Sequence, residues 1–428
     1  MRVGVVGTGL AGLTAAYELE RMGFSVVMLE TRRRVGGRLQ TVAEGDYLFE
    51  AGGEWIDAEH SRIVELAREF GIKADPAPPG PGRVFIDGEW SDEETLWPDV
   101  LADVERVESE AERLAREIGD APWENPPLVE LDQRTVHDFF VSMDLSPRGM
   151  KWLNAKYRSD EGEDLDRVSF LGWLWTYRNY LGRPKGAMSA LRLAGGMQGL
   201  CAQIAARIQG PIWTGATLRR VCQVSNKAYL QFEDGEVAVD RAVLAIPPRT
   251  VARVSFDPDL PLDRMRVFER LPMARAAKIC WRFLEPWWQK RGWNGRMITD
   301  TRIQQTWDGS RSERPVLSAY ITGSQAVEFS VSFEPVADGV ECLFRIFPEA
   351  RKTYVGGAFF EWSTDPHAVG AFPSIPPGGV FGMLGSLRLP FERVHFAGDH
   401  TAQWFGFAEG AVESGLRVAQ EVRDAESR

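Results

Sequence analysis

The chain has little cysteine for its length of 428 residues. Its four cysteines are Cys201, Cys222, Cys280 and Cys342, and none forms a C-x-x-C or C-x-x-H pair. We therefore expect no zinc site and no other metal. A few scattered thiols in a long chain are typical of a reducing compartment, so the composition predicts a cytoplasmic protein.

Long apolar runs and a surplus of positive charge are also missing. No run approaches the roughly 18 apolar residues that cross a bilayer, and the polar C-terminal segment predicts no membrane anchor. The opening segment MRVGVVGTG begins directly with a strand pattern, which predicts no signal peptide. The net charge of −11 argues against nucleic acid or an anionic membrane as the main partner, because both favour basic patches.

Residues 1–30 have the pattern of a strand, a glycine-rich turn, a helix and a second strand, which together make a βαβ unit. The turn GTGLAG places Gly7, Gly9 and Gly12 in the G-x-G-x-x-G spacing. Gly7 permits a tight turn, Gly9 lets the backbone approach a pyrophosphate, and Gly12 lets the helix pack close to the strand. Glu30 ends the second strand, where it can accept hydrogen bonds from ribose hydroxyls.

The first helical turn, with Leu10 and Ala11, would present free N–H groups to the phosphates of a dinucleotide. NAD and FAD both fit at this point. The segment TRRRVGGRLQT then follows Glu30 directly and adds a second glycine pair beside an arginine. Its candidate cofactor residues are Thr31, Arg32, Gly36, Gly37 and Arg38. A second close backbone approach and a cation for phosphate suit the longer FAD better than NAD.

Beyond this unit the pattern alternates between helices and strands. The Pro- and Gly-rich loop DPAPPGPGR is a plausible domain border. Residues 91–120 predict an amphipathic helix with an acidic outer face, and 136–182 predict helices rich in core aromatics. Strands are predicted over 212–257 and are expected to dominate 275–350, and the last stretch predicts a strand, a glycine-rich turn and a helix.

One predicted strand, AAKICWRF, carries Lys278 in a chain that has few lysines. Ala277, Ile279 and Trp281 alternate onto one face of this strand, while Lys278 shares the other face with small or polar neighbours. Two interpretations follow from the pattern. The lysine is either solvated, or its face lines an internal cavity and the amine projects into it.

The motifs ETRRRVGGRLQT, FEAGGEWID, RLAGGMQGL, AVLAIPP, EWSTDPHAVGAF and FAGDHT…GFAEGAVESG occur in this order along the chain. Together they resemble the flavin-containing amine oxidase family nearly from end to end. The resemblance implies bound FAD and an α/β fold, in which a discontinuous Rossmann-like FAD-binding domain is joined to a substrate domain of mixed β-sheet flanked by helices. It implies FAD-binding parts at 1–80, 192–260 and 379–428, and substrate-domain parts at 81–191 and 261–378.

By that resemblance, further cofactor contacts would come from Gly52, Gly53, Glu54, Trp55, Val221, Ala245, Trp362, Gly398, Asp399, Phe407 and Ala408. Lys278 falls where the family keeps a lysine that holds a water against the flavin N5. Burial disfavours the charged form of an amine, so such a lysine can help water handle a proton or guide dioxygen. Phe372 and Phe407 match two facing tyrosines of the family and would sandwich the amine substrate. Ala371 stands where mitochondrial relatives carry the cysteine that bonds the flavin, so we expect non-covalent FAD.

The activity implied is oxidation of a small amine by hydride transfer to flavin, with the imine hydrolysed and dioxygen reduced to hydrogen peroxide. The partners implied are an amine and dioxygen, and a homodimer is left open. Three alternatives remain. An L-amino-acid oxidase would need an arginine for the substrate carboxylate; Glu54 argues against it, but Arg62 lies close in sequence. A desaturase or porphyrinogen-type oxidase would need a lipophilic channel. A non-catalytic flavin-bearing interaction protein would leave its flavin unreduced by amines.

Overall fold

The glycine-rich turn and its flanking strands form as the sequence predicts. In the computed structural model, which describes residues 1–182 and 188–426, β1 (Arg2–Val6) leads into α1 (Leu10–Arg21) and β2 (Ser25–Glu30). Gly7 has a φ of +100°, a conformation that favours glycine. A Cβ atom on Gly12 would lie 2.0 Å from the carbonyl oxygen of Gly7, so only glycine lets α1 start so close to β1.

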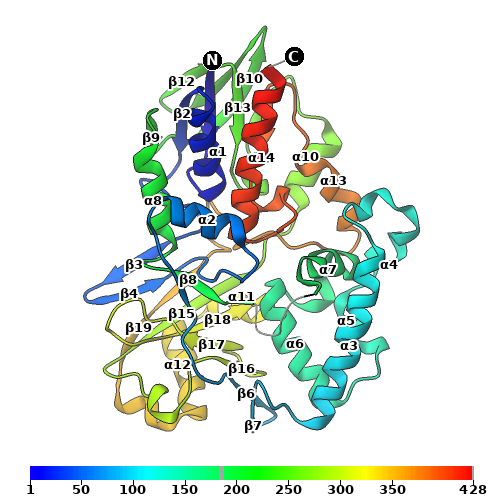
Figure 1. The fold of residues 1–428 in the computed structure, drawn as a ribbon, viewed down its shortest axis with the longest axis vertical. Coiled ribbons are helices and arrows are strands. Elements are labelled where there is room, and N and C mark those ends of the chain that lie inside the picture. The colour runs from blue at the N-terminus through cyan, green and yellow to red at the C-terminus, as the bar shows by residue number, and fades with distance from the viewer. Residues whose placement is uncertain (183–187, 427–428) are drawn as a thin grey trace.

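These strands belong to a five-stranded sheet built from three separate parts of the chain. Its order is β20-β13-β1-β2-β9, and all neighbours are parallel. The other members are β9 (Ile212–Thr214), β13 (Arg241–Leu244) and β20 (Val394–Phe396). α1 packs against α14 (Ala408–Glu426) and α8 (Met197–Arg207), and α1 and α14 run side by side in Figure 1. The first helix therefore packs against α14, from the other end of the sequence.

A four-stranded sheet in the order β12-β11-β10-β14 packs on β1. Its strands are β10 (Leu218–Val224), β11 (Lys227–Phe232), β12 (Gly235–Val239) and β14 (Ser255–Asp257). A Cβ atom on Gly4 would lie 2.5 Å from the Leu230 side chain, which shows how closely β11 approaches β1. The strands predicted over 212–257 are thus present.

A seven-stranded sheet, in the order β19-β15-β18-β17-β16-β6-β7, forms the second large layer. Its strands are β6 (Arg83–Ile86), β7 (Glu89–Asp92), β15 (Ala276–Phe283), β16 (Met297–Thr299), β17 (Gln305–Asp308), β18 (Val316–Thr322) and β19 (Tyr354–Glu361). Ala277, Ile279 and Trp281 of β15 belong to a fully buried apolar cluster, as their alternation predicts. The opposite face carries Lys278.

The expectation that strands dominate residues 275–350 is wrong after β18. That stretch folds into α11 (Gly323–Ser330) and α12 (Pro335–Ile346), which cover the apolar face of the sheet. Val336, Val340 and Leu343 recur at helical spacing, and Pro335 suits the first turn of a helix. Gly323, with a φ of +63°, follows the last residue of β18 and begins α11.

A group of helices lies beside the seven-stranded sheet, at the lower right of Figure 1. They are α3 (Pro98–Glu117), α4 (Val129–Gln133), α5 (Val136–Ser142), α6 (Pro147–Glu161) and α7 (Phe170–Tyr177). α3 is the predicted amphipathic helix; it begins later than predicted because residues 89–92 pair as β7. The aromatic residues Trp152, Tyr157, Trp173 and Trp175 are buried, as expected for a core.

Shorter elements connect these layers. They are β3 (Thr41–Glu44) paired with β4 (Tyr47–Glu50), β5 (Ala74–Pro76) paired with β8 (Leu191–Leu193), and the helices α2 (Ser61–Glu69), α9 (Pro248–Val251), α10 (Leu262–Arg270) and α13 (Gly385–Leu387). The segment after β4 and the strand β8 lie between the large layers and carry charged residues of the candidate site.

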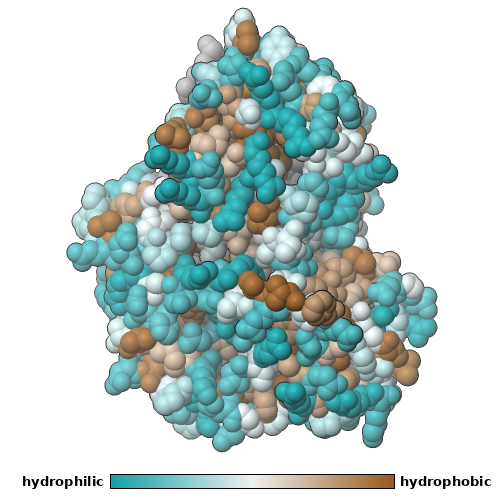
Figure 2. Space-filling model, turned by 180° about the vertical axis from the view of Figure 1, so that it is seen from behind, coloured by the Kyte–Doolittle hydropathy of each residue, from teal (hydrophilic) through white to brown (hydrophobic). Residues whose placement is uncertain are grey.

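The predicted fold class is confirmed. The strands of the parallel sheet all fall within 1–80, 192–260 and 379–428, and those of the seven-stranded sheet within 81–191 and 261–378. We propose this division as the domain arrangement. Within residues 1–182 and 188–426, no helix combines the length and apolarity needed to cross a membrane. Figure 2 shows a mostly hydrophilic face with hydrophobic residues in small groups.

Substituting Gly12→Ala should destabilise the protein and lower its flavin content, because the new Cβ would overlap the Gly7 carbonyl. We expect a loss of at least about 2 kcal/mol in the free energy of unfolding. The matched control is Gly199→Ala in α8, where a Cβ meets nothing within 4 Å. That change should be neutral or stabilising by up to about 1 kcal/mol. Urea unfolding of both variants checks this, and equal effects would contradict it.

Candidate active site

The end of β2 meets the glycine-rich turn through Glu30. Its carboxylate is 5% exposed and accepts from the Thr8 backbone N–H at 2.9 Å and the Thr8 hydroxyl at 2.5 Å. The backbone N–H of Arg32 donates to the other oxygen at 2.8 Å. The next residue, Thr31, lies 2.5 Å from Thr217 through their hydroxyls. Glu30 is thus a fixed acceptor at the carboxyl end of the parallel sheet.

Two glycine turns lie against each other beside the start of α1. Gly9 and Gly36 pair as an isolated parallel bridge, and the Gly36 N–H donates to the Thr8 carbonyl at 2.8 Å. A Cβ atom on Gly9 would meet only the Cα of Gly37, at 4.0 Å. Open space therefore faces the N-terminus of α1, where Leu10 and Ala11 form the first turn. Such a cradle fits a pyrophosphate.

Arg38 joins the N-terminal and C-terminal parts of the chain through Asp399. Its guanidinium bonds both carboxylate oxygens, Nη2 at 2.6 Å and Nη1 at 3.0 Å, and donates to the Ala371 carbonyl at 2.8 Å. Burial would raise the pKa of Asp399, but the Arg38 charge outweighs it and holds the pKa at about 2. Gly398, with a φ of +141°, turns the chain so that Asp399 faces Arg38.

Two other predicted cofactor residues, Ala245 and Val221, lie in or directly after strands of different sheets. Ala245 follows β13, donates its N–H to the Val6 carbonyl at 2.8 Å, and lies beside Gly7 and Gly12. Val221 is fully buried in the middle of β10, paired with β11 on one side and β14 on the other. The contact of its backbone with adenine stays a prediction. In the same segment, Thr217 contacts the end of β2.

The segment after β4 passes directly over Arg38. A Cβ atom on Gly52 would lie 1.8 Å from the Arg38 carbonyl oxygen, and the Gly53 N–H donates to that oxygen at 3.3 Å. The Trp362 indole N–H donates to the Ala51 carbonyl at 2.9 Å. The structure therefore brings Trp362 to the same short segment as the paired glycines.

Lys278 projects from β15 toward this segment. The residue is 7% exposed, so the solvated interpretation of this lysine is wrong. Its Nζ donates to the Gly52 carbonyl at 2.8 Å, to Oε2 of Glu54 at 3.0 Å, and to the Glu50 carbonyl at 3.4 Å. Tyr320 on β18 and Phe360 on β19 lie directly opposite it and share its face of the sheet.

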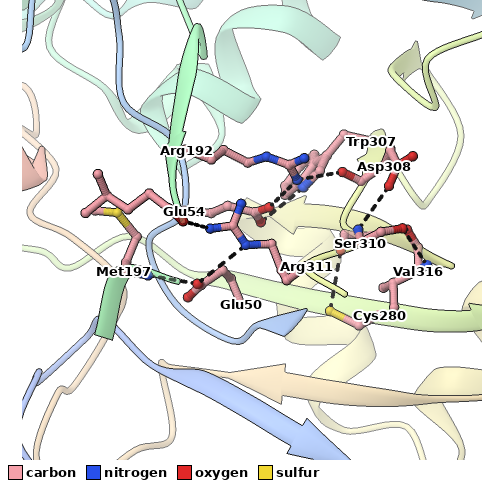
Figure 3. A network of polar contacts seen from close by, with 12 residues as sticks. Glu50, Glu54, Arg192, Met197, Cys280, Trp307, Asp308, Ser310, Arg311 and Val316 are labelled. Carbon is pink, nitrogen blue, oxygen red and sulfur yellow. Dashed lines mark hydrogen bonds and ion pairs between the residues drawn. The ribbon is translucent and has the colours of Figure 1, made fainter. Parts of the chain in front are cut away.

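Glu54 is the centre of a buried network of charges, shown in Figure 3. Besides Lys278, it accepts from the Trp307 indole N–H at 3.1 Å and from Nη1 of Arg192 at 3.2 Å. Arg192 also donates to the Asp308 carbonyl at 2.8 Å and stacks 4.9 Å from the centre of the Trp55 ring. Burial alone would raise the pKa of Glu54, but Lys278 and Arg192 lower it below its ordinary value.

A second buried carboxylate, Glu50, ends β4. It accepts from the Met197 backbone N–H at 2.9 Å and the Thr41 hydroxyl at 3.0 Å, while Nε of Arg311 lies 4.0 Å away. Burial and the neighbouring Glu54 charge raise the pKa of Glu50 to about 7. This carboxyl therefore changes its protonation state near neutral pH.

The Phe372 ring approaches the backbone next to Phe407, while its far end lies against Gly162, where a Cβ atom would be 2.5 Å from Cζ. A Cβ atom on Gly406 would lie 3.4 Å from the Phe372 ring, so Phe372 reaches the residue that precedes Phe407. The Phe407 ring packs on His60 and Trp404, with ring centres 5.1 Å and 5.9 Å away. Ala408 begins α14 directly after Phe407.

Sequence reasoning missed Arg192, Trp307 and Tyr320. Trp307 and Tyr320 reach the site through the register of β17 and β18 against β15, which no local pattern reveals. Arg192 did carry a signal, since it is a charged residue within the apolar stretch that becomes β8. Arg62, a candidate for binding a substrate carboxylate, is instead paired with Glu409 at 3.1 Å.

The family model of the flavin containing amine oxidoreductases matches residues 10–423 of this chain. The chain belongs to this family. It is 28% identical to the probable flavin-containing monoamine oxidase A of Dictyostelium discoideum over 446 residues, with 98% of this chain and 97% of that protein covered. It is 27% identical over 450 residues to the bovine flavin-containing amine oxidase A, with 98% and 84% covered.

Solved structures of amine oxidases share the fold. The cyclohexylamine oxidase of Brevibacterium oxydans superimposes with a TM-score of 0.92 at 24% identity, covering 100% of this chain and 99% of that one. A putrescine oxidase with bound putrescine has a TM-score of 0.92 at 23% identity, with 99% of both chains covered. The predicted family, the flavin cofactor and the class of enzyme, a flavin-dependent amine oxidase, are confirmed.

Replacing Glu50 with Gln should change how stability depends on pH. The folded protein keeps the Glu50 proton between its ordinary pKa of 4.5 and about 7, whereas the unfolded chain releases it. Wild-type stability should therefore fall relative to Glu50→Gln as pH rises from 5 to 8, by roughly 2 to 3 kcal/mol. Urea unfolding at several pH values measures this difference.

The matched control is Asp103→Asn, because burial raises the pKa of Asp103 less than its bonds to Ser146 and Arg106 lower it. Asp103 therefore titrates below this range, and its effect on stability should be constant between pH 5 and 8. If the free energies of unfolding of wild type and Glu50→Gln differ by a constant amount over the same pH range, the raised pKa of Glu50 is contradicted.

Proposed function

We propose that this enzyme binds FAD non-covalently and oxidises a small primary or secondary amine with dioxygen as acceptor. The observation that carries the proposal is the Lys278 amine, buried and held 2.8 Å from the Gly52 carbonyl, in the segment that also contacts Arg38. A cationic group at this point lies between the cradle for the dinucleotide and the inner face of the seven-stranded sheet.

The residues present fit FAD along the carboxyl end of the parallel sheet. Glu30 would accept from the ribose hydroxyls, and the backbone N–H groups at the start of α1 would face the pyrophosphate. Arg38 would supply a cation near the phosphates, with Asp399 fixing its orientation. Adenosine would lie near Thr31 and Thr217, whose hydroxyls meet just after β2, with Val221 as the predicted contact of its adenine.

When bound, FAD would accept a hydride from the carbon beside the amine nitrogen and later reduce dioxygen to hydrogen peroxide. The side chains would orient the substrate and exclude water. Phe372 and Phe407 would hold the amine between their rings, attracting a charged amine through the ring quadrupole. Lys278 would hold a water or a proton beside the reacting edge. The imine product would hydrolyse to an aldehyde or ketone and ammonia or a smaller amine.

An amine suits the site better than an amino acid. Arg38, Arg62 and Arg192 are already paired with Asp399, Glu409 and Glu54, which leaves them less suited to hold a substrate carboxylate. Relatives named as monoamine oxidases support a monoamine. The composition supports a cytoplasmic location, and a homodimer stays a prediction.

A peroxide-coupled screen over monoamines, diamines and L-amino acids tests the proposal. We expect a yellow protein whose flavin remains in the supernatant after acid precipitation, since Ala371 offers no thiol for a covalent bond. Monoamines should release peroxide and bleach the flavin under anaerobic conditions. Bleaching by L-amino acids alone would favour the amino-acid oxidase, and a flavin that no amine reduces would overturn the proposal.

Lys278→Met should retain FAD but slow reoxidation of the reduced enzyme by dioxygen at least about tenfold, because a fixed positive charge near the flavin is lost. Stopped-flow absorbance after mixing reduced enzyme with oxygenated buffer measures the rate. The control is Lys290→Met, a surface lysine paired with Glu285. Equal reoxidation rates in wild type and Lys278→Met would remove this role from Lys278.

A further inference from the structure

Lys278 has one acceptor that carries a charge. Two of its three hydrogen bonds end on the backbone carbonyls of Gly52 and Glu50, and the third ends on the Glu54 carboxylate at 3.0 Å. The side chains of Lys278 and Glu54 are 9% and 1% exposed. Burial disfavours an ammonium group, and a carboxylate in contact opposes that effect. Glu54 is therefore the carboxylate that bonds the Lys278 amine directly.

Glu54 is itself fixed from two other elements. Trp307 of β17 and Arg192 of β8 each donate to its carboxylate, as Figure 3 shows. The Trp307 ring also lies beneath the Lys278 ammonium, with 5.1 Å between Nζ and the ring centre. Because both carboxylate oxygens have a donor from a rigid strand, Glu54 holds the amine at one point of the sheet face.

Three cations, Lys278, Arg192 and Arg311, surround two carboxylates, Glu50 and Glu54. A third buried carboxylate, Asp308, follows on β17 and accepts from Trp288 and Gln289. Among the cations, Lys278 is the one that bonds the Gly52 carbonyl. Reoxidation moves two electrons from the reduced flavin to dioxygen, which takes up two protons to become hydrogen peroxide. Negative charge develops on the oxygen before the protons arrive, and a fixed cation stabilises it.

We propose that Glu54 is a positioning residue that acts through Lys278, fixing its amine and keeping it charged while dioxygen is reduced. This rests on the proposed function. The role differs from repulsion of substrate carboxylates, which the sequence suggested for Glu54, because the Glu54 charge is already neutralised by Lys278 and Arg192.

Of the other groups that face Lys278, Tyr320 and Cys280 stay protonated near neutral pH, whereas Glu50 is a second carboxylate. Tyr320 lies opposite on β18, and Cys280 follows two residues along β15. Burial raises the pKa of Tyr320 well above its ordinary value and that of Cys280 to about 12. Phe360 and Trp307 carry no charge, and Glu50, with its pKa raised to about 7 by burial, is ionised above that pH.

A double-mutant cycle over Glu54→Gln, Lys278→Met and the double variant tests the proposal. The flavin is reduced with dithionite, so no amine is needed and failure of the amine oxidase assignment leaves the test intact. Wild-type reoxidation should be nearly constant from pH 7.5 to 9.5. In Glu54→Gln it should slow at least fivefold across that range as the amine loses its proton. In the Lys278→Met background, Glu54→Gln should add no pH dependence.

A pH profile of Glu54→Gln that parallels the wild-type profile would overturn the proposal. So would a Glu54→Gln change that alters the slope of reoxidation rate against pH equally with Lys278 present and with Lys278→Met. Glu54→Asp keeps the charge and should retain most of the flat profile. If Glu54→Gln fails to fold, Glu54→Asp takes its place in the cycle. A pH dependence of Glu54→Asp that is equally large in the Lys278→Met background would then contradict the proposal. The control is Asp103→Asn, which removes a buried carboxylate on α3 and should leave the pH profile of reoxidation flat.

Thermal unfolding of the flavin-free protein supplies a readout without the cofactor. If the two side chains form the buried pair, the fall in Tm of the double variant should be smaller than the sum of the two single falls. A strictly additive fall means that Glu54 and Lys278 do not stabilise each other, which contradicts the proposal.

Discussion

Buried charge is the constraint that shapes this protein, because a charge away from water is stable only beside a partner. Asp399 has Arg38, and Glu54 has Lys278 and Arg192. Each partner comes from a distant part of the chain, so satisfying the charges also brings together the layers of the fold. The cofactor cradle and the inner face of the seven-stranded sheet meet at these pairs.

Local patterns revealed the parts of the fold in which nearby residues decide the structure. The glycine-rich turn and Glu30 belong to one βαβ unit, so spacing alone located both. The alternation along β15 separated the Lys278 face from the apolar face. It left open whether the Lys278 face was exposed to solvent or lined an internal cavity. Burial of the lysine emerged only once the β4 segment and β18 were placed against it.

Sequence reasoning failed where the structure depends on register or on distant partners. Trp307 reaches Glu54 only because β17 pairs with β18 in one particular register. The helices α11 and α12 were read as strands because short apolar runs fit both periods.

The parallel sheet has β1 at its centre, yet its edge strand β20 and the covering helix α14 follow all its other strands in the chain and are made after them. Arg38 meets its carboxylate partner only when residue 399 has been made. The dinucleotide cradle therefore cannot close around its ligand during synthesis of the first domain segment. Loading of the coenzyme must therefore await the synthesis of residue 399, which is far from the glycine-rich turn in the chain.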